Sequence, residues 1–225
     1  AAYSRNRLRR LAGHRQLNTS ASALERATMV YVLAGEYERD PEIAAIGFLD
    51  WEGASLLMDG RTIPASALPE RLEIESTAPM PDFFQWQRDQ FIVSDAFKKK
   101  LERLAPSKFE YLPISLHGPS TLNLTQGYYF INCLSLDQLI DWSKITPQHN
   151  YNDVTDPQGR RLLRAPLTTE KRNMPFKPTP AMHIWRERDI ETAGIIYAFY
   201  PQKILMTDDF WTELDRAFPG QLDQH

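Results

Sequence analysis

Hydrophobic positions recur in short runs along most of the chain, and turn residues separate these runs. The run of residues 127–134 (GYYFINCL) is the most strand-like and predicts a central strand. Pro113 predicts an edge strand or a bend for its own run, because proline cannot donate to a strand ladder. Further predicted strands cover residues 29–37, 43–51, 72–75, 109–117, 160–166, 181–186 and 195–200.

Polar and proline-rich stretches between these runs predict connections. Residues 79–90 (PMPDFFQWQRDQ) and 146–160 (TPQHNYNDVTDPQGR) are expected to be irregular, and 168–180 forms a long loop. The spacing of Leu136, Leu139 and Ile140 predicts a short helical turn. The strands at 181–186 and 195–200 are expected to pair around a turn near residues 192–194.

One pattern occurs twice, 113 residues apart. Residues 91–107 (FIVSDAFKKKLERLAPS) and 204–220 (ILMTDDFWTELDRAFPG) share five identical positions. Each copy predicts an apolar strand, a capping hydroxyl at Ser94 or Thr207, and an amphipathic helix that ends before proline. Chance resemblance between two common strand–helix units is the alternative interpretation.

The order of elements predicts an α+β fold. We expect a largely antiparallel sheet with two similar strand–capped-helix units packed on it, because many strands are interrupted by few helices. Residues 1–24 are interpreted as a basic arm and linker, and residues 25–225 as a single domain with a possible sub-boundary near 80–90.

Charge is unevenly distributed along the 225 residues. Residues 1–15 hold five arginines and no acid, whereas the remaining 210 residues hold 21 basic and 29 acidic residues, a balance of −8. An acidic body disfavours general nucleic-acid binding and suits a basic protein partner such as a nuclease. A module that binds nucleic acid through the arginine-rich start remains an alternative.

The chain shows no apolar run near the roughly 20 residues that span a bilayer and no export leader, so no membrane association is expected. Cys133 is the single cysteine, which excludes an internal disulfide and fits a reducing cytoplasm. It lies in an apolar strand, where a thiol acts as a small hydrophobe.

No reactive motif stands out. The five histidines lack metal-ligand spacing, the glycines form no phosphate-binding loop, and no nucleophile elbow is present. We therefore expect no catalytic residue, no metal and no cofactor. An enzyme with a dispersed, hydrolase-like active site remains an alternative that this pattern does not exclude.

Aromatic residues beside charges provide the better candidates for binding. Large rings anchor protein interfaces because they bury much area at low entropic cost. A proline-flanked segment can present its rings outward, so residues 82–88 (DFFQWQR) are the first candidate and the polar loop near 151 the second. The predicted partner-binding residues are Asp82, Phe83, Phe84, Trp86, Tyr151 and Asp153.

The order of several segments resembles a known family. A Pro-Asp-Phe-Phe segment at 81–84 precedes the first strand–Ser–Asp–helix unit, and a Met-His-Ile-Trp-Arg strand at 182–186 precedes the second. Between them lie Phe-Glu-Tyr-Leu-Pro (109–113), Tyr-Tyr-Phe-Ile-Asn (128–132) and the stretch from Asp137 to Lys144. The combination, over roughly residues 55–220, resembles the immunity proteins of bacterial polymorphic toxin systems, families eleven and forty-three.

This resemblance implies a cytoplasmic protein that is not an enzyme. It would bind and block a cognate toxin domain, delivered by neighbouring cells or made in the same cell, by stoichiometric protein–protein contact. The departures from the family pattern are the arginine-rich start and the missing strand after Pro219.

Overall fold

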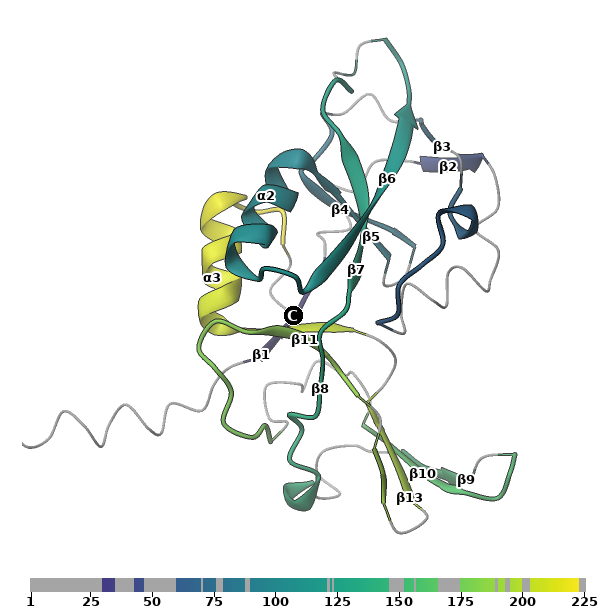
Figure 1. Ribbon diagram of the computed structural model, residues 1–225, viewed down its shortest axis with the longest axis vertical. Helices are drawn as coiled ribbons and strands as arrows, with labels where there is room; N and C mark the ends of the chain where they lie inside the picture. The colour runs from purple at the N-terminus through teal and green to yellow at the C-terminus, as the bar shows by residue number, and fades with distance from the viewer. Residues whose placement is uncertain are drawn as a thin grey trace, which may run out of the picture.

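The computed structural model describes residues 30–34, 43–46, 60–69, 71–75, 79–87, 90–120, 122, 124–145, 152–155, 157–165, 175–188, 190–192, 195–199 and 203–222. The predicted basic arm at 1–24 lies outside these residues. The described part is an α+β fold, as the sequence predicts: its strands form one six-stranded and two four-stranded sheets, and two α-helices pack beside them (Figure 1).

The six-stranded sheet forms the upper half of the molecule in Figure 1. Its strands are ordered β2-β3-β6-β7-β5-β4, and every neighbouring pair is antiparallel except β3 and β6. The predicted central strand is confirmed, since β7 lies between β6 and β5. The bounds are β2 Ile43–Ile46, β3 Arg71–Ile74, β4 Phe83–Gln87, β5 Gln90–Ser94, β6 Phe109–His117 and β7 Tyr128–Cys133.

Two four-stranded sheets form the lower half. The first has the order β1-β14-β11-β8, and the second, called the small sheet here, has the order β12-β13-β10-β9. Each contains one parallel pair, β11 with β8 and β10 with β13. The bounds are β1 Val30–Val32, β8 Leu136–Asp137, β9 Asn152–Thr155, β10 Arg161–Ala165, β11 Ile184–Glu187, β12 Ile190–Thr192, β13 Ile195–Phe199 and β14 Ile204–Thr207.

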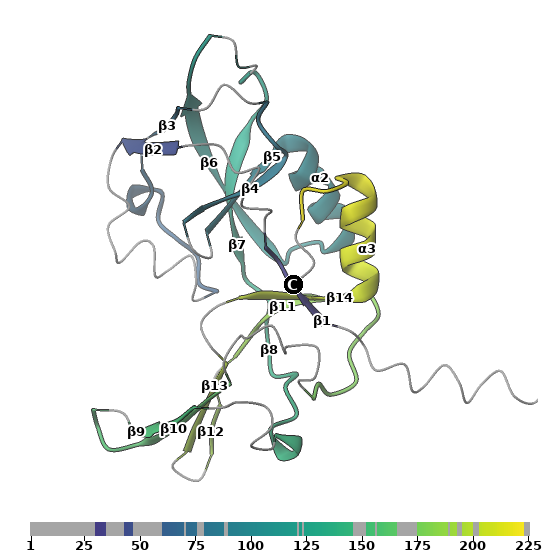
Figure 2. The same ribbon diagram turned by 180° about the vertical axis from the view of Figure 1, so that it is seen from behind.

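The two α-helices, α2 (Asp95–Leu104) and α3 (Asp208–Ala217), follow β5 and β14 directly and lie side by side (Figures 1 and 2). Short 3-10 helices lie at η2 (Ala65–Ala67) and η3 (Trp142–Lys144). Ser94 caps α2 as predicted, because its Oγ accepts a hydrogen bond from the amide of Phe97 at 3.2 Å. The predicted cap at Thr207 is wrong: its side chain makes no bond to the first turn of α3.

The predicted repeat is a structural one. Every position of α2 has its counterpart 113 residues later in α3, and Lys100 forms an ion pair with its counterpart Glu213 at 2.8 Å. The strands beside β5 and β14 match as well. β4 and β11 pair with them in the same antiparallel register, and β7 and β1 pair on the other side. The molecule therefore contains two copies of one three-stranded unit with a helix, joined at the helices.

The main apolar cluster lies between the helices and the two sheets. It includes Phe97 and Phe218, whose rings are 4.6 Å apart, together with Phe210 and Leu214 of α3. Alternation along the strands sends the next set of side chains to the opposite face of the six-stranded sheet, where Phe130 and its neighbours pack under residues 63–68. A third cluster around Trp185 packs beneath β11 and β14.

Several expected connections are strands instead. Residues 79–90, expected to be irregular, contain β4, and the polar stretch 146–160 contains β9. The expected turn at 136–140 begins as β8. The expected pairing of 181–186 with 195–200 is wrong, since β11 pairs with β14 and β8 whereas β13 pairs with β12 and β10. Pro113 lies within an inner strand. However, β3 pairs only with residues 115–117 of β6, so Pro113 does not have to donate a backbone hydrogen bond to β3.

Candidate interaction surface

Phe83 and Phe84, two of the predicted anchors, are core residues. They are neighbours on β4, so their side chains point to opposite faces of the sheet, and both faces are covered. Phe83 is 2% exposed and packs on Phe91 and Phe97, while Phe84 is fully buried against Tyr128. The expectation that these rings point outward is wrong. The polar, proline-flanked segment forms a strand, and both faces of that strand are covered.

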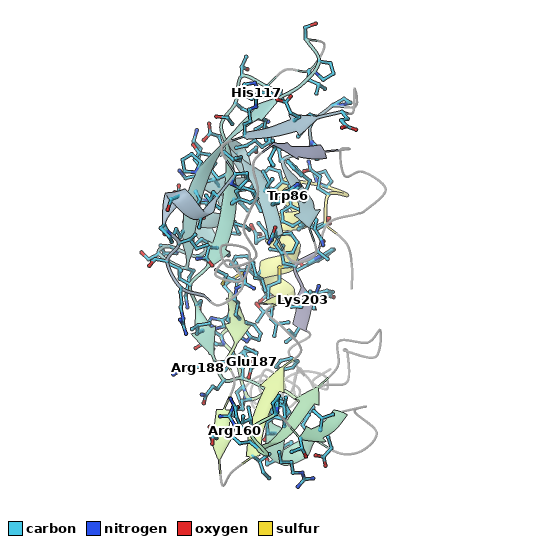
Figure 3. The ribbon with its side chains drawn as sticks, turned by 90° about the vertical axis from the view of Figure 1, so that its right-hand side faces the viewer. Trp86, His117, Arg160, Glu187, Arg188 and Lys203 are labelled. Carbon is cyan, nitrogen blue, oxygen red and sulfur yellow. The ribbon has the colours of Figure 1, made fainter. Side chains whose placement is uncertain are left out.

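Asp82 and Trp86 flank these two rings and have structural contacts of their own. The carboxylate of Asp82 accepts a hydrogen bond from Ser94 Oγ at 2.5 Å, which ties the start of β4 to the cap of α2. Its backbone N–H donates to the side chain of Gln221 at 2.8 Å. Trp86 is half-buried and packs on Phe130, with ring centroids 5.6 Å apart (Figure 3). Their role in binding stays a prediction.

The two remaining candidates lie elsewhere. Tyr151 is outside the described residues, and Asp153 is an exposed residue of β9 in the small sheet. Figures 1 and 2 place β9 at the end of the molecule opposite β4, so the predicted residues do not form one site. Asp153 contacts Arg161 of the adjacent strand at 2.5 to 3.1 Å, and this hydrogen-bonded guanidinium lowers the pKa of the carboxyl group.

The hairpin formed by β9 and β10 is exposed and contains a large apolar side chain. Every described side chain from 153 to 161 is exposed, including Val154 at 44%. Arg160 lies at the end of the turn and is labelled in Figure 3. Sequence reasoning missed Val154 and Arg160 because the segment looked like a polar loop. The available signal was the Pro-Gln-Gly turn between Asn152–Thr155 and the apolar residues that follow.

A chain of polar groups joins the two halves of the molecule. Lys108 Nζ donates to Ser135 Oγ at 2.7 Å, and Ser135 Oγ lies 3.3 Å from a carboxylate oxygen of Asp137. The same oxygen is 2.9 Å from His183 Nε2, and the His183 ring stacks on Trp185. The network connects the turn before β6 to the start of β11.

This network does not have the order that activates a serine. In a serine hydrolase, histidine lies between serine and acid and takes the proton of the serine. Here Asp137 lies between Ser135 and His183, and Ser135 is 8% exposed. The hydrogen bonds of these side chains therefore link the two sheets and give each group a structural partner.

The other groups with reactive potential are also held by the core. Cys133 is fully buried, and this burial raises the pKa of its thiol. Among the described residues, no three His, Cys, Asp or Glu side chains gather closely enough to hold a metal ion.

Comparison with known families supplies the assignment. The model of the immunity protein family Imm11 matches residues 29–196, which is more than two thirds of the chain. The chain belongs to the Imm11 immunity protein family. The sequence resembles immunity families eleven and forty-three, and the matching model is that of family eleven. A search of curated proteins gives no match.

The Imm11 match covers most of the architecture but not all of it. It begins next to β1 and ends within β13, so it includes the six-stranded sheet and the β9–β10 hairpin. In this Imm11 chain, β14 and α3 lie beyond the match, although β14 pairs between β1 and β11. Neither helix of the described residues has the length and hydrophobicity needed to cross a membrane.

Proposed function

We propose that this Imm11 protein binds a cognate toxin domain and neutralises it by stoichiometric protein–protein contact, without catalysis of its own. Membership of the immunity protein family over residues 29–196 carries the proposal. The structure supports it in two ways. In its polar network the acid lies between serine and histidine, which is not the order of a serine hydrolase. Its exposed hairpin offers a surface for contact.

The partner is a folded toxin domain that acts in the cytoplasm. A stoichiometric inhibitor must hold its target tightly, with a dissociation constant on the order of nM, about −12 kcal/mol. Interfaces of about 1,600 Å² with a few well-buried anchors reach this affinity. The acidic balance of residues 16–225 suits a basic domain such as a nuclease, since opposite charge speeds encounter.

The test uses the C-terminal domain encoded by the adjacent upstream reading frame. We expect that domain to stop growth when it is produced in a bacterial host, and co-production of this protein to restore growth. The purified pair should elute as a one-to-one complex, and calorimetry should give one site. A toxin domain from an unrelated locus is the control and should show neither effect.

A variant separates this proposal from the enzymatic alternative. Ser135→Ala removes the hydroxyl from the polar network and should leave protection and stoichiometry unchanged, apart from a modest loss of stability. Protection by amounts of protein far below those of the toxin, lost in Ser135→Ala while the complex still forms, would favour an enzyme. Absence of any complex between the wild-type proteins would refute the proposed function.

A further inference from the structure

The described side chains of the small sheet lie outside the three apolar clusters. None of them is a member of a cluster. Leu162 is buried, at 8% exposure, within the small sheet itself. Figures 1 and 2 show the sheet below the other two, with the β9–β10 hairpin extending outward.

Contacts along the hairpin hold it in an extended form. β10 lies between β9 and β13, so the hairpin is supported by a ladder on its inner side. Asp153 and Arg161 bind across the strands, and Gly159 takes the positive φ of 80° that the turn requires. A protruding segment that is already ordered loses little conformational entropy when it binds.

The described charged side chains of the hairpin are paired within the small sheet. Arg161 faces Asp153, and Arg160 lies 3.7 Å from Glu191 of β12. Val154 is opposite Leu162 in the register, so its exposed apolar side chain lies on the other face of the hairpin from the Asp153–Arg161 pair, on an outer strand of the sheet. A protruding, ordered hairpin whose described charges are paired and which exposes an apolar side chain is suited to close contact with a concave protein surface, because these paired charges need not be left without partners on burial.

We infer that the β9–β10 hairpin is the element of this protein that enters a cleft of the toxin domain. The inference rests on the proposed function and names the contacting surface. Its centre is Val154, with Arg160 at the turn. A second copy of this chain is the competing occupant, and the test below distinguishes it.

The experiment measures affinity for the upstream-encoded toxin domain by calorimetry, with two matched pairs of variants in the full chain. Val154→Asp is paired with Met182→Asp, because Met182 is exposed to a similar extent, 39% against 44%, away from the small sheet. Arg160→Glu is paired with Arg103→Glu on the exposed side of α2. These four side chains are exposed, so their substitution should leave the fold intact, which circular dichroism and thermal melting will verify.

We expect Val154→Asp to weaken binding at least about 30-fold, the loss that marks an interface hot spot. Arg160→Glu should weaken it about 10-fold, and the two controls should stay within about 3-fold of the wild type. Equal affinity of Val154→Asp and the wild type would overturn the inference and leave the proposed function standing. A wild-type protein that binds no toxin would overturn both. A dimer of this chain that Val154→Asp dissociates, with toxin binding unchanged, would assign the hairpin to self-association and also overturn the inference.

Discussion

At the scale of single residues, Glu187 illustrates how a carboxylate can organise a turn. Its side chain accepts hydrogen bonds from the amides of Leu139 and Ile140, at 3.1 and 2.9 Å, and from the indole of Trp185 at 3.0 Å. These bonds fasten the segment after β8 to β11. Burial nevertheless raises the pKa of this carboxyl group above the ordinary value of 4.5, since the charged form is poorly solvated.

The raised pKa makes a prediction about stability. The folded state binds a proton at Glu187 more tightly than the unfolded state does, so this contribution is fully present below pH 4.5 and is lost as the pH rises through the folded pKa. Relative to Glu187→Gln, the free energy of unfolding of the wild type should therefore fall between pH 4 and the folded pKa and stay constant above it. Urea titrations at a series of pH values measure this difference.

Glu213 gives the matched control of opposite sign. Its hydrogen bond to Lys100 lowers the pKa of the carboxyl group, so the corresponding stability is present above pH 4.5 and lost as the pH falls through the folded pKa. Relative to Glu213→Gln, the wild type should gain stability as the pH rises. Parallel curves for Glu187→Gln and the wild type would contradict the role of burial at Glu187.

At the scale of elements, the two strand–helix units use the same hydroxyl position differently. Ser94 caps α2, whereas the Oγ1 of Thr207 accepts from the amide of His183 at 3.0 Å and donates to the carbonyl of Ala181. The residues before β11 need these partners, because the chain enters that strand through a bend. Equivalent positions thus have different roles: one caps a helix, and the other anchors the neighbouring strand.

Hydrogen exchange can test this divergence. In Ser94→Ala the amide of Phe97 loses its acceptor, so the first turn of α2 should exchange faster and the protein should lose about 1 kcal/mol of stability. In Thr207→Val the amide of His183 should exchange faster, while the first turn of α3 keeps its protection. Faster exchange in the first turn of α3 would instead show that Thr207 acts as a cap.

Element type was predictable where periodicity was strong. The helices α2 and α3 and the central strand β7 have clear apolar patterns, and the structure contains all three. β4 and β9 were missed because prolines, glutamines and charges flank or interrupt them. Local pattern also could not pair β11 with β14, since pairing between distant strands depends on the packing of the whole chain.

The candidate surface was predictable only in part, for the same reason. Asp153 is exposed on the hairpin and its role in binding stays a prediction, whereas Phe83 and Phe84 have the aromatic character of interface anchors but the burial of core residues. Composition does not distinguish these two roles, because both interfaces and cores favour large aromatic rings. The position of a ring relative to the second face of a sheet decides between them, and that position is a tertiary property.

At the scale of the molecule, the structural repeat places a basic helix beside an acidic one. α2 carries Lys98, Lys99, Lys100 and Arg103, whereas α3 carries Asp208, Asp209, Glu213 and Asp215. The equivalent positions Lys98 and Trp211 make different ring contacts, since the first lies over the ring of Tyr129 and the second stacks on Tyr31. The Lys100–Glu213 pair fixes the two helices side by side, and the exposed acids of α3 add to the negative field of the body.

This charge distribution predicts that different parts of the protein attract the toxin and make the close contacts with it. If the acidic body attracts a basic toxin while the nearly neutral hairpin makes the close contacts, then salt should act mainly on the association rate. Raising the salt concentration from about 50 to about 500 mM should slow association by about tenfold or more and change dissociation little, as measured by stopped-flow mixing and surface plasmon resonance. Asp208→Asn combined with Asp209→Asn should slow association at low salt, and Lys99→Gln on α2 should accelerate it. An association rate that is independent of salt would remove the electrostatic part of the proposal and leave the hairpin contact to account for binding.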